Sequence, residues 1–237
     1  MNKIIVSQAD IERIESQTKG QAKNEKWHQA RKNLLTSPNF GLVCKKKDNT
    51  PPESILKTVL SYNDFSSKAT QWGRKHEPAA RRKYSLTFGK AHDNFKVSEC
   101  GLLIFEDMPY LGASPDGLVE CTCCGMGILE VKCPFRYRFQ SPMMAAKDPS
   151  FYLNEVDQKL QLKKNHNYYF QVQGQLAISG RKFCDFFVWT LQGYSVERIY
   201  FDPQLWQDMS HKLQSFYLNC IMPELYSERV KRGKPLK

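Results

Sequence analysis

The chain has 237 residues, of which 41% are hydrophobic and 25% charged, and its formal net charge is +11. These values are ordinary for a globular protein and argue against wholesale disorder. No apolar run approaches the roughly 18 residues that cross a bilayer, and the N-terminal apolar stretch is too short for a signal peptide. We therefore expect one large intracellular domain with no membrane partner.

The basic excess points to a polyanionic partner. Lys and Arg number 35 against 24 Asp and Glu, and nucleic acid is the commonest polyanion that such a surface attracts. The alternative is that the charge serves solubility or lies in a basic tail, but the basic residues are spread along the chain. The patch at 231–234 would favour the nucleus in a eukaryotic cell, although we interpret it as a solvated tail; sequence does not distinguish nucleus from cytoplasm.

In chain order, apolar spacing and helix-breaking residues predict a polar helix over about 11–35 and a loop over 45–64. A helix follows from Ser66 or Ser67 to about residue 84, bent or restarted at Pro78. Later elements are strands at 95–105, 110–113, 118–120 and 128–133, a helix over 154–179, a hairpin of 183–191 and 194–201, a helix over 203–229, and a loose basic tail. This order indicates an α/β (α+β) fold, a central mixed β-sheet flanked by helices.

Eight cysteines occur in a chain without a secretory signal, so we expect reduced thiols or metal ligands and no disulfides. The one dense cluster is Cys121, Cys123 and Cys124. It lacks the two paired C-x-x-C sets typical of structural zinc sites. We favour a hairpin loop rich in small thiols, with structural Zn²⁺ at these three residues as the alternative.

The segment from Ile128 to Cys133 carries the first candidates for chemistry. In a strand, Glu130 and Lys132 share one face, and burial of that face requires that they pair with each other, a metal or a ligand. A short loop between two strands can bring Asp116 beside Glu130, where two carboxylates repel unless a divalent cation lies between them. Such a cation with a neighbouring Lys suits phosphodiester hydrolysis. The alternative is a surface ion pair and an ordinary turn.

A third carboxylate, Glu77, precedes Pro78. The plain interpretation is an ion pair with Arg81 on a solvated helix face. Pro78 disfavours a regular helical conformation at the residue before it, and a bend there can direct Glu77 inward.

These residues lie in ordered strings that resemble a known family. Pro115-Asp116 followed by Glu130-Val131-Lys132 is similar to the PD-(D/E)XK nuclease signature. The longer strings resemble the lambda exonuclease and YqaJ-like viral recombinase family, and the similarity extends from about Trp27 to Gln173. These strings are Trp72-Gly73-x-x-x-Glu77, Ser114-Pro115-Asp116-Gly117-Leu118, Leu129-Glu130-Val131-Lys132-Cys133-Pro134-Phe135 and Gln171-Val172-Gln173.

The resemblance implies one nuclease domain over 1–237 with a restriction-endonuclease-like core. Its parts would be a helical and loop region to about 65, a catalytic core over 66–201, a C-terminal helix over 202–228 and a basic tail over 229–237. The implied activity is Mg²⁺-dependent digestion of one strand of linear duplex DNA from a 5′ end, with Mn²⁺ as a substitute. This would serve recombination or replication. The resemblance also implies a ring-shaped homotrimer and a single-strand annealing partner, neither of which the residues themselves establish.

Roles carried over by motif make Asp116, Glu130 and the Val131 carbonyl metal ligands, with Glu77 contributing directly or through water. Lys132 would activate the attacking water. One amide of the pair Gln171 and Gln173 would pack against the active site. We assign Gln173 there, and we assign Gln171 to DNA binding.

The family's pocket for a 5′-phosphate has its counterpart in Trp27-x-x-x-Arg31 and Leu35-Thr36-Ser37-Pro38. Arg31 suits a bidentate phosphate contact, and Ser37 and Ser114 would assist. Pro38 stands where the family usually has Ser, so a strict requirement for the phosphate does not follow.

Arg136 and Arg138, which alternate with aromatic residues after Pro134, are the predicted contacts to the DNA backbone. Backbone contacts position DNA without reading its sequence. Two alternatives remain: an endonuclease or structure-specific nuclease on the same core, and a catalytically silent module that binds DNA ends.

Overall fold

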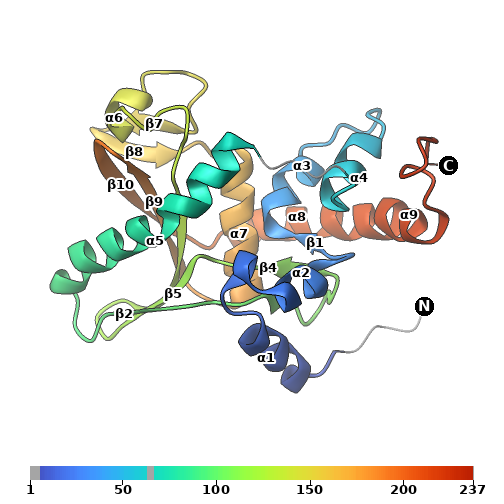
Figure 1. Cartoon of the computed structure of the whole chain (residues 1–237), viewed down its shortest axis with the longest axis horizontal. Helices are drawn as coiled ribbons and strands as arrows, with labels where there is room; N and C mark the ends of the chain where they lie inside the picture. The colour runs from blue at the N-terminus through green and yellow to red at the C-terminus, as the bar shows by residue number, and fades with distance from the viewer. Residues whose placement is uncertain (1–5, 63–66, 237) are drawn as a thin grey trace.

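The computed structural model describes residues 6–62 and 67–236, and its centre is a five-stranded mixed sheet (Figure 1). The strand order is β10-β9-β6-β5-β2, in which β6 and β9 are parallel and the other neighbours antiparallel. The predicted sheet and the hairpin after residue 183 are confirmed. The strands are β2 (Lys96–Ser98), β5 (Gly117–Cys121), β6 (Gly125–Lys132), β9 (Phe183–Thr190) and β10 (Gly193–Tyr200).

The middle strand β6 is buried on both faces, because a helix packs on each side of the sheet (Figure 1). Ile128 belongs to the core on one side, together with Val172. Leu129 belongs to the core on the other side, together with Tyr84. The two helices are α7 (Asn167–Ser179) and α5 (Lys68–Phe88).

Helix α5 is longer than the sequence predicts and runs through Pro78 without ending. Ser67 caps it, since the Ser67 side chain accepts a hydrogen bond from the Thr70 N–H; Ser66 lies outside the described residues. The predicted restart at Pro78 is wrong. Proline removes one backbone hydrogen bond, but Ala80 and Tyr84 pack the following turns onto the sheet.

The single helix predicted over 11–35 is three shorter elements. Gly20 has φ +85°, a left-handed conformation that does not continue a helix. The Asn24 side chain then caps a new helix by accepting a hydrogen bond from the Lys26 N–H. Such left-handed backbone favours glycine, and Asn is a strong N-cap. The elements are α1 (Gln8–Gln17), the 3₁₀ turn η1 (Gln21–Lys23) and α2 (Glu25–Arg31).

The strand predicted over 95–105 is divided between two sheets. Its first part is β2, and its second part joins a three-stranded sheet of order β1-β4-β3. Gly101 lies at the crossing, where an added Cβ would lie 1.9 Å from the Glu15 carbonyl oxygen, so only glycine fits. These strands are β1 (Leu35–Thr36), β3 (Leu103–Ile104) and β4 (Leu111–Ala113).

The helix predicted over 154–179 is wrong in its first half. Residues there form a hairpin of β7 (Leu153–Val156) and β8 (Lys159–Leu162), joined by Asp157 and Gln158, which both have positive φ. A two-residue loop of this kind matches the twist of a hairpin. Burial alternates along β8, and α7 begins only at Asn167, capped by the His166 side chain.

Helices on the far side of α7 include a short one inside the predicted loop over 45–64, of which residues 63 and 64 lie outside the described residues. The single helix predicted over 203–229 contains a π-helical turn. None of the helices in the described residues is both long and apolar enough to span a membrane. The remaining elements are η2 (Ser37–Asn39), α3 (Phe40–Cys44), α4 (Glu53–Val59), η3 (Gly89–Ala91), α6 (Pro142–Ala145), α8 (Pro203–Phe216), η4 (Tyr217–Ile221) and α9 (Met222–Ser227).

The basic tail is not loose over its described part. The fully buried carboxylate of Glu224 accepts hydrogen bonds from the N–H groups of Val230 and Lys231 and from the Tyr62 hydroxyl. Val230 is itself buried. A buried carboxylate with three donors holds the tail against the C-terminal helices.

Candidate active site

Four predicted residues line one cavity of about 540 Å³ between α5, the β5–β6 pair and α7. Gly117 pairs with Leu129 in the antiparallel ladder, so Asp116 and Glu130 come next to each other where the ladder ends. Lys132 lies two residues further along β6, and α5 supplies Glu77. Val131, whose carbonyl is the other predicted ligand, lines the same cavity.

Glu130 is held by three side chains. Its Oε1 accepts from Gln171 Nε2 at 2.8 Å and from Lys132 Nζ at 2.5 Å, and its Oε2 accepts from Gln175 Nε2 at 2.7 Å. The Glu130 side chain is only 4% exposed. A buried carboxylate needs such partners, and these fix its orientation toward the cavity.

Lys132 is positioned as tightly as Glu130. Its ammonium donates to Gln171 Oε1 at 3.2 Å and lies 4.2 Å from the centre of the Tyr168 ring. Burial by itself lowers the pKa of Lys132, but the charge of Glu130 and then Tyr168 and Asp116 overcomes burial and raises the pKa above its usual value. In this arrangement Lys132 is a cation.

Asp116 and Glu77 both carry raised pKa values. Burial is the main cause for Asp116, and the charges of Glu130 and Glu77 add to it, although Asp116 Oδ2 accepts from Val131 N–H at 2.7 Å. Burial also dominates for Glu77; Arg81 and Lys132 oppose the rise, and Glu130 adds to it. Proximity of three carboxylates therefore costs free energy when all are ionised.

This donor set fits a hard divalent cation. Carboxylate and carbonyl oxygens are the ligands that Mg²⁺ and Mn²⁺ prefer. Lys132 is the cation that contacts Glu130, while Arg81 and Lys23 act on Glu77; burial and mutual repulsion still raise the pKa values of Asp116 and Glu77. A cation at the cavity would relieve that repulsion.

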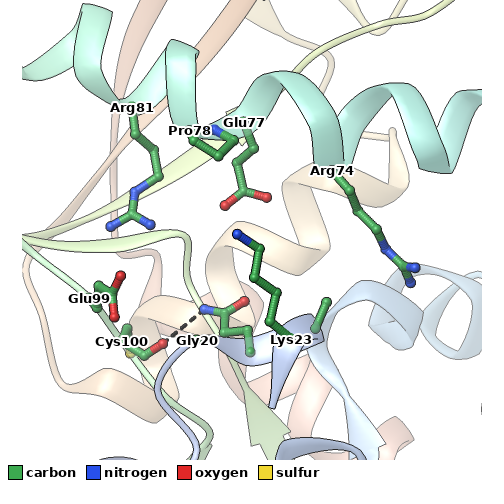
Figure 2. Close-up of a pocket in the computed structure, with 10 residues that line it drawn as sticks. Gly20, Lys23, Arg74, Glu77, Pro78, Arg81, Glu99 and Cys100 are labelled. Atoms are coloured by element: carbon green, nitrogen blue, oxygen red, sulfur yellow. Dashed lines mark hydrogen bonds between the residues drawn. The ribbon is translucent and has the colours of Figure 1, made fainter.

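A second cavity, of about 340 Å³, opens on the other side of Glu77. Figure 2 shows the Glu77 carboxylate pointing from α5 into this space, with the Lys23 ammonium facing it and with Arg74 and Arg81 on the same side of the helix. Gln21 donates to the carbonyls of Cys100 and Pro115 and so ties η1 to the residue before Asp116. Glu77 thus lies between two openings that both have basic side chains at their walls.

The N-terminal motif residues also gather. Thr36 pairs with Gly112 in the parallel β1–β4 ladder, so Ser37 and Ser114 both follow the same end of this ladder. Arg31 lies 3.9 Å from the centre of the Trp27 ring and donates to Thr36 Oγ1 at 3.0 Å. Trp27 Nε1 donates to Ser114 Oγ at 2.9 Å.

Two features of this group suit it to binding an anion. Burial lowers the pKa of Arg31 to about 10, since no carboxylate in the described residues pairs with it. The Ser37 hydroxyl is fully buried and has no hydrogen-bond partner within residues 6–62 and 67–236. Buried polar groups are almost always bonded, so these two donors can receive a ligand.

A family model, the YqaJ-like viral recombinase domain, matches residues 26–182. The chain belongs to the YqaJ-like viral recombinase family. That match includes α5, the β5–β6 pair and α7, and so Glu77, Asp116, Glu130 and Lys132; Gln21 and Lys23 on η1 lie before it. Curated protein sequences contain no match to the chain.

Solved structures similar to this YqaJ-family chain include exonucleases. The alkaline exonuclease LHK-Exo of Laribacter hongkongensis, in complex with dAMP, is 26% identical, with a TM-score of 0.63 over 89% of this chain and 98% of that one. SOX, the shutoff and exonuclease protein of Kaposi's sarcoma-associated herpesvirus, in a DNA complex, is 14% identical, with a TM-score of 0.60 over 89% and 70%. A phage-related exonuclease from Haemophilus somnus is also 14% identical, with a TM-score of 0.55 over 82% and 96%.

These findings confirm the PD-(D/E)XK-like fold and place the YqaJ-family chain among nucleases. The neighbours below 25% identity support the fold alone.

The expectation for Gln173 is corrected by the structure. Its amide donates to the Tyr200 carbonyl at 3.0 Å and accepts from Asp202 N–H at 2.9 Å, so it ties α7 to the start of α8. Gln171 is the amide of that pair that contacts Glu130 and Lys132. In a helix, positions two residues apart point in different directions, so only one of the two can reach the cavity.

The predicted DNA contacts Arg136 and Arg138 differ in position. Arg136 lines the cavity, is exposed, and donates to Asp148 at 3.2 Å. Arg138 donates to the Phe135 carbonyl and lies over the Phe135 and Phe139 rings. Of the two arginines, Arg136 is therefore the one whose side chain can contact a ligand in the cavity.

Sequence reasoning missed Gln175 and Tyr168. Gln175 lies four residues after Gln171, so both reach Glu130 from the same face of α7. The i, i+4 spacing of Gln171 and Gln175 was the signal available in the sequence. It identifies both as site residues only when the face of α7 that packs toward β6 is known. Tyr168 stands one turn before Gln171 and contacts Lys132 through its ring.

Proposed function

We propose that this chain is a Mg²⁺-dependent deoxyribonuclease that degrades one strand of linear duplex DNA from its 5′ end, and that Mn²⁺ substitutes for Mg²⁺. The observation that carries the proposal is the convergence of Glu77, Asp116 and Glu130 with Lys132 in one cavity. Three hard ligands and an adjacent cation are what metal-assisted phosphodiester hydrolysis requires.

Asp116, Glu130 and Glu77, with the Val131 carbonyl, are the residues that would hold the ion. When bound, the ion supplies Lewis-acid stabilisation of negative charge on the phosphate and a lower pKa for a bound water. Gln171 and Gln175 hold the Glu130 carboxylate in place, so its geometry does not depend on the ligand. Preorganisation of this kind reduces the reorganisation needed during the reaction.

Lys132 acts beside the scissile phosphate. After it has taken a proton from the attacking water, its ammonium would offset charge that develops on the phosphate oxygens. The carboxylates raise its pKa and burial lowers it. Once the negative charge of the carboxylates is compensated, burial remains as the main influence, and Lys132 becomes able to accept a proton from that water.

The 5′ end would be bound by Arg31, Ser37 and Ser114. The planar guanidinium of Arg31 suits a two-point contact with a phosphate, and it stacks on the Trp27 ring, which positions it. Ser114 lies two residues before Asp116, so an end seated there is close to the metal site. Pro38, which has no N–H, removes one backbone donor from this pocket.

The basic walls of the second cavity support passage of a strand past the metal site. Lys23, Arg74 and Arg81 line it, and Arg74 also lines the first cavity. Contacts of these side chains to phosphates would position a strand without reading its sequence. The dAMP in the LHK-Exo complex is a mononucleotide of the kind that such an enzyme would release.

The test uses linear duplex DNA with a 5′-phosphate on one strand and a label at each end in turn, with Mg²⁺ or with EDTA. A relaxed closed circle is incubated in parallel. We expect mononucleotides from the 5′ end of the linear substrate, only with the metal, and an intact circle. Nicking of the circle would assign an endonuclease instead, and binding of ends without cleavage would assign a silent module.

Assembly belongs to the same proposal. A ring-shaped homotrimer would hold the enzyme on DNA, and a single-strand annealing protein would receive the strand left behind; both rest on the resemblance of the motifs to the lambda exonuclease family. Sedimentation of the purified chain, with and without a DNA end, tests the first, and a three-fold mass is expected.

A further inference from the structure

A second cluster of metal-binding side chains lies at the opposite end of the β5–β6 pair from the carboxylates. It consists of Cys121 at the end of β5, Cys123 and Cys124 in the turn before β6, and His92 just after η3. Their ligand atoms all lie within 4.8 Å of one another. None of these residues lines the two cavities at Glu77.

Five of the six separations between the four ligand atoms are close to those of a tetrahedral site, and the sixth is within 4.8 Å. Cys123 Sγ lies 3.6 Å from Cys121 Sγ and 3.8 Å from Cys124 Sγ. His92 Nδ1 lies 3.1, 3.4 and 3.8 Å from the sulfurs of Cys123, Cys124 and Cys121. Ligands held 2.0–2.3 Å from a tetrahedral Zn²⁺ are separated from each other by roughly 3.4–3.8 Å.

The backbone around the cluster is arranged as in a metal-binding turn. Cys121 and Cys124 are separated by two residues, the shortest ligand spacing of structural zinc sites. Gly125 follows with φ +83°, which turns the chain back into β6. The N–H and the hydroxyl of Thr122 both donate to the Asp93 carbonyl, at 3.0 and 3.1 Å, and so fix the segment of His92 against the turn.

We propose that His92, Cys121, Cys123 and Cys124 bind one structural Zn²⁺ ion. Three thiolates and an imidazole form the Cys₃His set of closed zinc sites, and the soft sulfurs select against the Mg²⁺ of the catalytic cavity. Three thiolates and Zn²⁺ sum to one negative charge. The guanidinium of Arg198, which pairs with Asp185 at 2.8 and 2.9 Å, also interacts with Cys124.

The ion would join elements that carry the catalytic carboxylates. His92 follows α5 and η3, which lead from Glu77, while the cysteines close the strand pair that holds Asp116 and Glu130. A closed site at this end fixes the register of β5 against β6, and it anchors the chain that follows α5 to the same turn. The ion itself takes no part in the reaction.

The test is metal analysis of the full chain, expressed without a histidine tag and dialysed against metal-free buffer. We expect one zinc per chain by plasma mass spectrometry, and none in the double variant Cys121→Ser/Cys124→Ser. Cys220→Ser, a half-buried thiol remote from the cluster, is the matched control and should retain zinc. Asp116→Asn should also retain zinc, which separates this site from the catalytic one.

Two measurements on the wild type keep the test decisive if the variant does not fold. Replacement by Co²⁺ should give the intense visible absorption of a tetrahedral thiolate complex. Native alkylation should spare the exposed Cys123 until a chelator is added. Substoichiometric zinc, equal metal content in the double variant, weak octahedral cobalt absorption or immediate alkylation of Cys123 would each overturn the proposal.

Discussion

Two substitutions in the cavity should both strongly reduce the cleavage rate and yet change stability in opposite directions. Asp116→Asn removes one of three neighbouring carboxylates, while Lys132→Met removes the ammonium that compensates them. If the cavity holds an excess of negative charge in the absence of metal, the first change relieves repulsion and the second increases it.

The expected sizes follow from the contacts. Asparagine at 116 can still accept from Val131 N–H, and loss of the charge weakens that bond by about 1 kcal/mol. Each unit by which the folded-state pKa of Asp116 exceeds its unfolded value corresponds to about 1.4 kcal/mol that the amide recovers at pH 8. We expect the free energy of unfolding to rise by about 1–2 kcal/mol.

Lys132→Met should lower the free energy of unfolding by about 3 kcal/mol, since it leaves Glu130 buried without its counter-charge. This value is at the low end for a broken buried pair because Gln171 and Gln175 still donate to Glu130. For a chain of this length, each kcal/mol moves the melting temperature by about 2–4 °C.

Stability is measured by urea unfolding at pH 8 in EDTA, and cleavage on labelled linear duplex with Mg²⁺; both variants should lose at least about a hundredfold in rate. Asp208→Asn and Lys159→Met make the same changes at exposed positions and serve as controls. Mg²⁺ should raise the melting temperature of the wild type and not of Asp116→Asn. Equal destabilisation by both cavity variants would refute the excess of negative charge.

Further predictions concern pH, the 5′ end and the core. In EDTA, Asp116 and Glu77 contribute stability through their raised pKa values at pH below their ordinary pKa values, and this stability is lost as pH rises through their pKa values in the folded protein. The increase in melting temperature caused by Mg²⁺ should therefore grow over that pH range. It should stay constant there if the two pKa values are ordinary. Arg31→Lys should reduce the preference for 5′-phosphorylated over 5′-hydroxyl ends about tenfold, the effect of one lost charged hydrogen bond; an unchanged ratio in a competition assay would remove Arg31 from the pocket. Tyr84→Phe should cost about 2 kcal/mol of unfolding free energy, because the Tyr84 hydroxyl donates to the buried Asp185 at 2.5 Å, and leave the rate per folded molecule unchanged in parallel urea and cleavage assays.

The gathering of Asp116, Glu130 and Lys132 could be predicted because it depends on short-range geometry. Two strands joined by a tight turn have a fixed register, and alternation of side chains along β6 puts Glu130 and Lys132 on one face. Asp116 then follows from its position at the end of the ladder. No long-range packing enters this step.

Elements that depend on packing were predicted less well. The hairpin of β7 and β8 lies in a stretch too short and mixed to separate a period of two from a helical period, and its turn uses Asp157 and Gln158 rather than glycine. The orientation of α7, which decides between Gln171 and Gln173, is set by the contact of its buried face with β6. His92 is 29 residues from Cys121 and joins the cysteines only through the return of the chain along β2.

Electrostatic repulsion acts at one end of the β5–β6 pair, and contacts around the pair oppose it. Asp116 and Glu130 are neighbours where the ladder ends; burial and then the charge of Glu130 raise the pKa of Asp116, and repulsion between the two carboxylates favours separation of the strands at that end. Two restraints oppose this: the buried amides of α7 on Glu130, and the covalent turn with its thiol cluster at the other end. Because a ladder slips by whole residues, fixing the far end prevents the near end from relieving its repulsion by a change of register, and the carboxylates stay where a cation can bridge them.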